Sequence, residues 1–558
     1  MVRGRIQEMD SALDAARDAY GRYDWGEAER CFRAASEETP LAPEDVERFA
    51  TCLHLLGKEG ESRDVLAAGY RRALEAGARA PAARLAFWVG HGLMFSGDDI
   101  QSRAWFERAR ELLGRPDCAE SGMVMIGDAI RLLFGGDPGG AERAFSAALA
   151  IGRQCGDAGL VAMGGHGRGR ALIALGRVDE GMAQLDEIMM SAMEGRVPPI
   201  IVGDVYCGVL EACHQVFDYR RAREWTAALT RWCESQPELV PYRGPCLVHR
   251  VDLLRFGGEW DDAFTEARKA CEWLSAPRSP EGPGDAYYLI GELHRLRGRF
   301  EEAEAAYREA SRHGRRPEPG LPLLWFARGH LAAARAAIGR AVQEAGGERS
   351  RRAELLGPYV EILLAAGEPA AARSAAIELA QLAAHFGAEA LAAAANGALG
   401  RVLIVEGSPS ESLDPLRHSW VAWQRLDAPY ESARVRVQVG IAYRALGDAN
   451  SAEMEFDAAR WVFQELGATP ELGKLDAMAP PLGSASLPGG LTTREVDVLR
   501  LIAEGQTNRE IAAALVISEH TVARHVQNML AKLGFSSRAR LAAFAIEKGL
   551  LPPTHGQH

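Results

Sequence analysis

Two polar side chains near the carboxyl end of the chain carry the kind of hydrogen-bonding groups that read the edges of nucleic-acid bases. Arg524 and Gln527 lie three positions apart, so on a helix they project from the same side. A guanidinium can bond guanine O6 and N7 together, and a carboxamide can do the same with adenine N6 and N7. The alternative is an ordinary solvated helix face, so the surrounding elements must decide between the two.

The residues around this pair predict four short helices within residues 491–550. The third helix has an apolar stripe at steps of four, three and four residues, as a buried face does, formed by Val522, Val526, Met529 and Leu533. Arg524 and Gln527 then fall on the opposite face, together with His520. The third helix therefore turns one polar side away from the core.

Capping signals mark the helix starts. Thr492 with Glu495, and Thr507 with Glu510, have the S/T-x-x-E spacing of a capping box, in which hydroxyl and carboxylate satisfy free backbone N–H groups. Ser518 is expected to open the third helix in the same way. These signals predict the first three starts.

Glycines mark the ends of the first and third helices. Gly505 and Gly534 stand where a left-handed residue closes a helix, and Ser536 or Ser537 then opens the fourth. The second and third helices are joined by the short connection 515–518, as in a helix-turn-helix, whose second helix enters the major groove of DNA.

Residues 491–550, about a tenth of the chain, resemble the DNA-binding domain of LuxR-type bacterial transcription regulators, also called FixJ- or NarL-type. The matching motifs extend through all four helices: Leu-Thr-x-Arg-Glu at 491–495, Ala-Glu-Gly at 503–505, Asn-x-Glu-Ile-Ala at 508–512, Ile-Ser-Glu-x-Thr-Val at 517–522, His-Val-x-Asn-Met at 525–529, Lys-Leu-Gly at 532–534 and Ser-Arg at 537–538.

The resemblance implies which side chains meet DNA. Three positions would face the bases: Ala523, Arg524 and Gln527. Seven would hold the sugar-phosphate backbone: Thr507, Asn508, Ser518, Thr521, His525, Asn528 and Lys532. Ala523 departs from the family, which often has Lys there, so the operator sequence does not follow from the relatives. The resemblance also implies a homodimer on half-sites roughly one helical turn apart.

The charge distribution fits a DNA-binding segment at one end. Residues 491–550 carry eight Arg or Lys against six Asp or Glu, a net charge of +2, whereas the whole chain carries −12. The remaining residues therefore carry −14. Because an acidic body repels DNA, binding should be confined to this segment and should weaken steeply with added salt.

A repeat of about forty residues runs through the rest of the chain. A clear copy has a turn residue, a small residue five positions later, an aromatic or aliphatic residue four beyond that, and a small or apolar residue three further on, as in Gly298, Ala303, Tyr307 and Ala310. Clear copies begin at Gly136, Gly258, Gly298 and Gly447, and the others are weaker. The turn residues are Tyr23, Gly57, Gly97, Gly136, Gly176, Phe217, Gly258, Gly298, Gly329, Gly367, Gly407 and Gly447. Each unit is predicted to be a helical hairpin that must stack on its neighbours, because one hairpin cannot bury its own apolar face.

This pattern resembles tetratricopeptide repeats, with a longer period like that of large maltose-activator-type LuxR regulators. We therefore expect an all-α protein: an α-solenoid over residues 8–475 that senses a signal or binds a partner, a flexible linker over 476–490, and a LuxR-type helix-turn-helix domain over 491–551. Pro, Gly and Ser dominate the linker and prevent helix continuation.

The sequence lacks the motifs of several classes of protein. Lys58 and Lys474 follow glycine, but Glu59 and Leu475 come next, so there is no P-loop of the kind that large maltose-activator-type regulators use. We find no catalytic motif, no metal-ligand spacing and no phosphoacceptor domain, and we expect no enzyme activity, no cofactor and no metal. The nine cysteines lack paired spacing and are expected to be free thiols.

Two functions stay open at this stage. The first is a sequence-specific transcription regulator that binds double-stranded DNA and whose solenoid holds either a protein partner or a small-molecule effector. The second is a helical-repeat scaffold or adaptor whose terminal helix bundle does not bind DNA. The sequence has no signal peptide pattern and no apolar run of membrane-spanning length, so we expect a cytoplasmic bacterial protein without membrane contact.

Overall fold

The computed structural model describes residues 2–113, 118–236, 238–275, 282–478, 489, 491, 493–515 and 519–550, apart from the side chains of 2–11, 493, 519–521 and 524. Within these residues all regular structure is helical, with 29 helices and no strand, which confirms the predicted all-α class. None of these helices is both long and apolar enough to cross a lipid bilayer. The nine cysteines, all among the described residues, form no disulfide with one another, as expected, and five of them are buried.

The helices of the repeat region are α1 (Val2–Gly21), α2 (Trp25–Glu38), α3 (Pro43–Leu55), α4 (Glu59–Glu75), α5 (Arg79–Phe95), α6 (Asp99–Leu112), α7 (Ala119–Phe134), α8 (Pro138–Cys155), α9 (Ala158–Ala174), α10 (Val178–Met193), α11 (Pro199–Gln215), α12 (Tyr219–Glu234), α13 (Arg243–Gly257), α14 (Trp260–Leu274), α15 (Gly284–Leu296), α16 (Phe300–Arg312), α17 (Gly320–Ala327), α18 (Leu331–Glu344), α19 (Arg349–Ala365), α20 (Pro369–Phe386), α21 (Glu389–Val405), α22 (Pro409–Arg425), α23 (Pro429–Ala445), α24 (Ala449–Leu466) and α25 (Thr469–Met478). Four shorter helices follow: α26 (Thr493–Ala503), α27 (Asn508–Leu515), α28 (Glu519–Leu533) and α29 (Arg538–Glu547).

The chain divides into two compact units. The larger comprises residues 1–447 and 455–470, and the smaller comprises residues 448–454 and 471–558. Most of the predicted linker, residues 479–488 and 490, lies outside the described residues.

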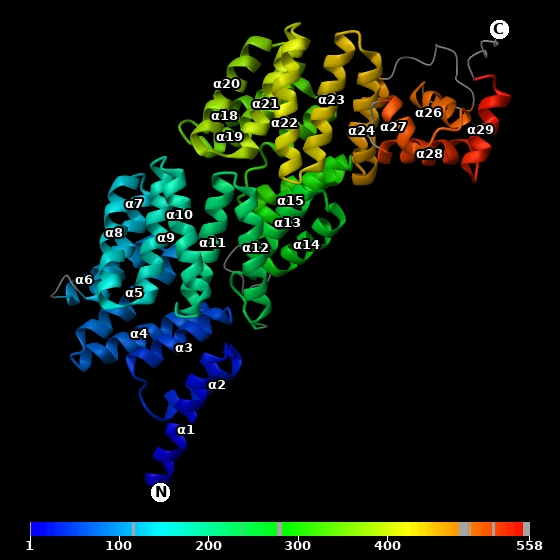
Figure 1. The fold of residues 1–558 in the computed structure, drawn as a ribbon. Helices are drawn as coiled ribbons and strands as arrows, with labels where there is room; N and C mark the ends of the chain where they lie inside the picture. The colour runs from blue at the N-terminus through cyan, green and yellow to red at the C-terminus, as the bar shows by residue number, and fades with distance from the viewer. Residues whose placement is uncertain are drawn as a thin grey trace, which may run out of the picture. The chain divides into compact units, whose positions relative to one another are not determined.

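In the larger unit, helices α1 to α22 pair as successive antiparallel hairpins (Figure 1). Each of the twelve predicted turn residues has a positive φ, between +60° at Phe217 and +85° at Gly258. Glycine reaches this left-handed region without the steric cost that a Cβ brings, which explains its recurrence at the turns. Phe217 and Tyr23 adopt the same conformation, so the turn geometry persists in repeats that lack the glycine.

The small and aromatic positions of the repeat form the interface between its helices. Phe106 of α6 is fully buried, and Cβ atoms added at Gly90 of α5 and Gly127 of α7 would lie 3.0 Å and 2.9 Å from its ring. One ring thus packs on the backbone of its own hairpin and on that of the next. The aromatic position of the repeat therefore fills the gap between neighbouring hairpins.

The amino-terminal repeats are closed by a segment from much later in the chain. Trp25 Nε1 donates to Gln236 Oε1 over 3.1 Å, and Val240 N donates to Leu55 O over 2.8 Å. Helix α11 also contacts α3 directly. Gln236 and Val240 therefore bind α2 and α3, although about 200 residues separate them in sequence.

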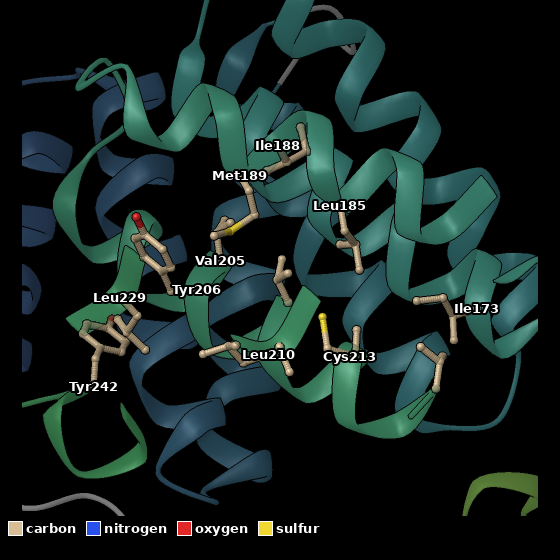
Figure 2. Packing of buried hydrophobic residues seen from close by; sticks show 14 of the residues in the cluster. Ile173, Leu185, Ile188, Met189, Val205, Tyr206, Leu210, Cys213, Leu229 and Tyr242 are labelled. Carbon is tan, nitrogen blue, oxygen red and sulfur yellow. The ribbon is translucent and has the colours of Figure 1, made fainter. Parts of the chain in front are cut away.

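Apolar side chains of α9 to α12, together with Tyr242 just before α13, form a buried layer (Figure 2). Its labelled members are Ile173, Leu185, Ile188, Met189, Val205, Tyr206, Leu210, Cys213, Leu229 and Tyr242. Each of them is at least nine-tenths buried. This layer holds α11 rigidly against its neighbours on both sides.

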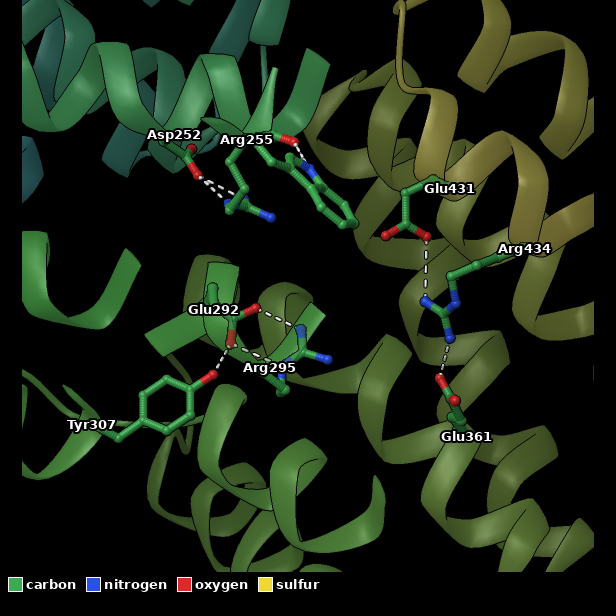
Figure 3. A network of polar contacts seen from close by, with 9 residues as sticks. Asp252, Arg255, Glu292, Arg295, Tyr307, Glu361, Glu431 and Arg434 are labelled. Atoms are coloured by element: carbon green, nitrogen blue, oxygen red, sulfur yellow. Dashed lines mark hydrogen bonds and ion pairs between the residues drawn. The ribbon is translucent and has the colours of Figure 1, made fainter. Parts of the chain in front are cut away.

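Further along the unit, charged side chains connect helices across repeats (Figure 3). Arg434 of α23 contacts Glu361 of α19 at 2.5 Å, and Arg295 contacts Glu292 within α15 at 2.7 Å. Tyr307 of α16 donates to Glu292 as well. Burial acts to raise the pKa of Glu292, but Arg295, Arg255 and the Tyr307 hydroxyl together outweigh burial, so that pKa is lowered and the carboxylate stays charged.

The close contact between ring and backbone gives a stability prediction. A Cβ added at Gly167 of α9 would lie 2.2 Å from Cε1 of Phe145. We expect Gly167→Ala to destabilise the fold by about 1–3 kcal/mol because the buried ring has no free space to move into. Thermal unfolding of the full chain, followed by circular dichroism, measures the change.

Gly339→Ala is the matched control, since the nearest heavy atom to its added Cβ is 4.0 Å away. This substitution should stabilise α18 by up to about 1 kcal/mol through helix propensity. Equal unfolding temperatures for the two variants would contradict the packing account.

Candidate nucleic-acid interface

The four short helices α26 to α29 have a core of their own. In α28, Val522 and Met529 are fully buried, and Val526 and Leu533 pack against the same cluster. The predicted apolar stripe of this helix is therefore confirmed. Buried residues from α26, α27 and α29 complete the cluster: Val496, Val498, Leu499, Ile502, Ile511, Ala512, Leu541 and Ala545.

The second capping box forms as predicted. Thr507 N donates to Glu510 Oε2 over 2.7 Å, and Glu510 N donates to Thr507 Oγ1 over 3.3 Å. These bonds stabilise the carboxylate, so the pKa of Glu510 is lowered, chiefly by the backbone N–H of Thr507. The predicted start signals at Thr492 and Ser518 lie outside the described residues.

The remaining helix ends also match the sequence signals. Gly505 and Gly534 have φ of +84° and +64°, as expected for residues that close helices. The fourth helix has Ser537 as its N-cap, whose hydroxyl accepts from Arg540 N over 3.4 Å. This contact decides between the two predicted serines. Each helix end in the described part of this region thus has a local chemical cause.

The face of α28 that lies away from the buried stripe carries polar side chains exposed to solvent. Gln527 and Asn528 are exposed, and Ala523 and His525 are partly exposed. The backbone of position 524 lies almost opposite Val522 and Met529 around the helix, since each residue turns it by about 100°. Of the other predicted DNA contacts, the side chains of Arg524 and Thr521 and the whole of Ser518 lie outside the described residues.

Three residues predicted to hold phosphates also have partners inside the domain. The Thr507 hydroxyl donates to Glu510 over 2.8 Å, and Asn508 Oδ1 accepts from Arg538 over 2.6 Å. Lys532 Nζ lies 2.7 Å from Oε2 of Glu495, whose side chain is 3% exposed. Lys532 itself is 40% exposed, so its remaining N–H groups can still reach a phosphate.

Two arginines that we did not predict as functional hold the helices in place. Arg538 donates to Asn508 and, over 2.6 Å, to the carbonyl oxygen of Gln506, which links α29 to the turn before α27. Arg494 donates to the carbonyl oxygen of Leu515 over 2.8 Å, linking α26 to the end of α27. Both stand in motifs that carry the family resemblance, and the motifs alone do not separate positioning from DNA contact.

Known proteins match both parts of the chain. Residues 490–545 match the family described as bacterial regulatory proteins, luxR family, and residues 284–312 match the tetratricopeptide repeat. The C-terminal helices thus form a LuxR-family helix-turn-helix domain, and the solenoid contains a tetratricopeptide repeat, as the resemblance implied.

The most similar relatives share this domain. The transcriptional regulatory proteins YhcZ and LiaR of Bacillus subtilis are 57% identical over 60 residues and 43% identical over 74 residues. The DNA-binding transcriptional activator DevR/DosR of Mycobacterium tuberculosis is 44% identical over 68 residues. These matches cover 11%, 13% and 12% of this chain, and 28%, 35% and 31% of the relatives. The solved structure of the APC/C hetero-tetramer Cut9–Hcn1 aligns with 84% of this chain and 96% of its own, at 11% identity and a TM-score of 0.37.

The contact between Lys532 and Glu495 gives a second prediction. We expect Lys532→Met to destabilise the C-terminal domain by about 1–3 kcal/mol, because it removes a cation that contacts the buried Glu495 carboxylate. Adding Glu495→Gln should recover much of that loss. Hydrogen exchange of α26 and α28 amides in the full chain measures the local stability, and unchanged exchange in Lys532→Met would show that the contact contributes nothing.

Proposed function

We propose that this chain is a sequence-specific, DNA-binding transcription regulator. In this proposal residues 491–551 bind the operator, residues 8–475 receive the signal, and residues 476–490 connect the two. The observation that carries it is the LuxR-family helix-turn-helix domain at residues 490–545, whose α28 buries one face and exposes Gln527 and Asn528 on another. If α28 were only a solvated surface helix, neither the LuxR-family motifs nor the surrounding helices α26, α27 and α29 would be needed.

In the proposed complex, α28 lies in the major groove. Arg524 and Gln527 read base edges beside Ala523, whose methyl group can contact thymine. Backbone contacts come from the seven residues that the resemblance implies: Thr507, Asn508, Ser518, Thr521, His525, Asn528 and Lys532. The bond from Arg538 occupies Oδ1 of Asn508 and so leaves its amide nitrogen as the donor for a phosphate.

Charge and symmetry complete the proposal. A net charge of +2 on residues 491–550 gives each domain weak attraction for DNA, so two copies on a pseudo-palindromic site would bind far better than one. We place the dimer contact on α29, the fourth helix, by family geometry. The acidic remainder, at −14, keeps the rest of the chain away from the phosphates.

The runner-up function is a helical-repeat scaffold whose terminal bundle does not bind DNA. A long solenoid is an ordinary platform for partner proteins, and that fact favours it. The two functions differ in one property that can be measured directly, which is salt-sensitive retention of specific duplexes.

Selection of bound duplexes from fragmented genomic DNA of the source organism tests the proposal. Full-length protein should enrich one pseudo-palindromic sequence, with binding that weakens steeply as salt increases. Arg524→Ala should cost about 1–3 kcal/mol at that sequence and relax one base position in each half-site, because a bidentate contact is lost. Lys532→Ala should weaken binding to all duplexes about equally.

Arg500→Ala is the matched control, since it removes the same charge from α26, where Arg500 bonds the carbonyl oxygen of Leu550. It should leave the selected sequence unchanged. If no duplex is enriched by the full chain, the scaffold function replaces the regulator. If Arg524→Ala and Arg500→Ala lose affinity equally on all sequences, the reading face has been misassigned.

A further inference from the structure

A cavity of about 170 Å³ lies in the amino-terminal part of the solenoid. Its walls come from α3, α4, α5 and α11, and residues 240–245 close it from the start of α13. Cavities near 150 Å³ can hold a benzene-sized molecule. The space is therefore suited to a small molecule with about one ring, and it exists because late residues fold back on the first repeats.

Aromatic side chains form much of the wall. The His91 ring lies 4.7 Å from that of Phe95 and 5.4 Å from that of Trp88, and the His54 ring lies 6.3 Å from that of Tyr242. Burial lowers the pKa of His54 to about 4 and that of His91 to about 3, so both rings are neutral at pH 7. Neutral aromatic faces of this kind attract an organic cation.

One carboxylate in the wall has no cation of its own. Asp204 of α11 accepts a hydrogen bond from the Tyr242 hydroxyl over 2.8 Å. His91 Nε2, at 3.9 Å from Asp204 Oδ2, is neutral, and no Lys or Arg nitrogen of the described residues forms a salt bridge with Asp204. Burial raises the pKa of Asp204 to about 7. The Asp204 side chain is 32% exposed. A partly buried carboxylate without a counter-ion is still costly, and a bound cation would relieve that cost.

Tyr242 is held in an unusual position to make this contact. Its φ is +67°, a left-handed conformation that costs a non-glycine residue free energy. A Cβ on Gly203 of α11 would lie 2.2 Å from the Tyr242 ring, so the glycine lets the ring lie flat against the helix. Strained backbone of this kind clusters at ligand-binding and active sites.

The charges around the cavity exclude an anionic ligand. Glu47, Glu59 and Asp204 line it, whereas Arg63 is the one basic residue of the lining. Arg63 donates to Ser96 Oγ over 3.2 Å, and Glu47 is engaged by Arg84 at 2.6 Å. The described residues contain no group of three or more His, Cys, Asp or Glu side chains that could hold a metal ion.

We propose that this cavity binds a small organic cation, a protonated amine carried on an apolar body of about one ring, with Asp204 as its counter-ion. The ammonium group lies against Asp204 and the neutral imidazoles, and the apolar body contacts Trp88 and Phe95. The assignment of this amine as the signal that the solenoid receives rests on the proposed function, whereas the binding does not.

Isothermal titration calorimetry on the full chain tests the site with three probes of one shape: 2-phenylethylamine, 2-phenylethanol and phenylacetate. At pH 8 the amine should bind at least about tenfold more tightly than the alcohol, because a charged hydrogen bond is added, and phenylacetate should bind most weakly. No binding of the amine at millimolar concentration, or tighter binding of phenylacetate, would overturn the proposal.

The pH dependence gives an independent readout. Asp204 faces Tyr242, His54, His91, Glu47, Glu59 and Arg63 across the cavity. With its pKa raised to about 7, Asp204 loses its charge as the pH falls from 8 to 6, while the two histidines stay neutral. Binding of the amine should weaken by up to about tenfold over this range, and binding of the alcohol should not change. A pH-independent affinity for the amine would contradict Asp204 as the counter-ion.

Asp204→Asn is the decisive variant, because asparagine keeps the acceptor for Tyr242 and removes the charge. It should weaken the amine about tenfold to a hundredfold and leave the alcohol unchanged. Glu211→Gln is the control, since Glu211 is on the same helix with a side chain 61% exposed and paired with Arg170 outside the cavity. Equal affinities for the amine in Asp204→Asn and Glu211→Gln would refute the site, and circular dichroism of both variants shows whether each is folded.

Calorimetry and duplex selection together distinguish failure of the cation site from failure of the proposed regulator. If the full chain binds the amine with the expected pH dependence but selects no duplex, the cation site stands and the proposed regulator fails. If the chain selects a duplex but does not bind the amine, the regulator stands and the cation site fails.

Discussion

The contact between an aromatic ring on one helix and the bare backbone of the helices beside it sets the geometry of the solenoid. Phe106 shows it most clearly, since its ring is enclosed between Gly90 and Gly127 of the two flanking helices. The contact needs a glycine because any Cβ would have to occupy the space of the ring. Left-handed turns, such as Gly97 in the same hairpin, bring the helices back so that the ring and the glycine meet. Repetition of this one packing arrangement makes each hairpin depend on its neighbours.

The cavity follows from that arrangement. Closely packed hairpins bring α11 into contact with α3, and Gln236 and Val240 bind Trp25 of α2 and Leu55 of α3 beside it. The aromatic and acidic residues of the wall come from the consecutive helices α3, α4 and α5, from α11 and from Tyr242 just before α13, so distant parts of the sequence meet there. The C-terminal helices also depend on the burial of apolar side chains, but in a separate core. Their own small core, centred on Val522 and Met529, fixes α28 so that its polar face stays outward.

Much of this architecture could be predicted from the sequence, because local rules govern it. Glycines predicted the left-handed turns, and Thr507 with Glu510 predicted the capping box. Apolar residues at helical spacing predicted the buried face of α28. Long-range contacts could not be predicted in this way. The sequence around Asp204 does not show that Tyr242 will bond to it. It also does not show that no Lys or Arg of the described residues will pair with it. Lys532 shows the same limit, since the family motif implies a phosphate contact and does not reveal its bond to Glu495.

The central claim is that α28 reads base edges through Arg524. Methylation interference at guanine N7, with full-length protein on its selected duplex, tests that claim most directly, because a bidentate guanidinium needs this atom. The account predicts one guanine in each half-site whose methylation prevents binding by the unaltered protein but has little effect on Arg524→Ala. Binding that is insensitive to methylation at every guanine of the half-sites, or equally sensitive in both proteins, would contradict it.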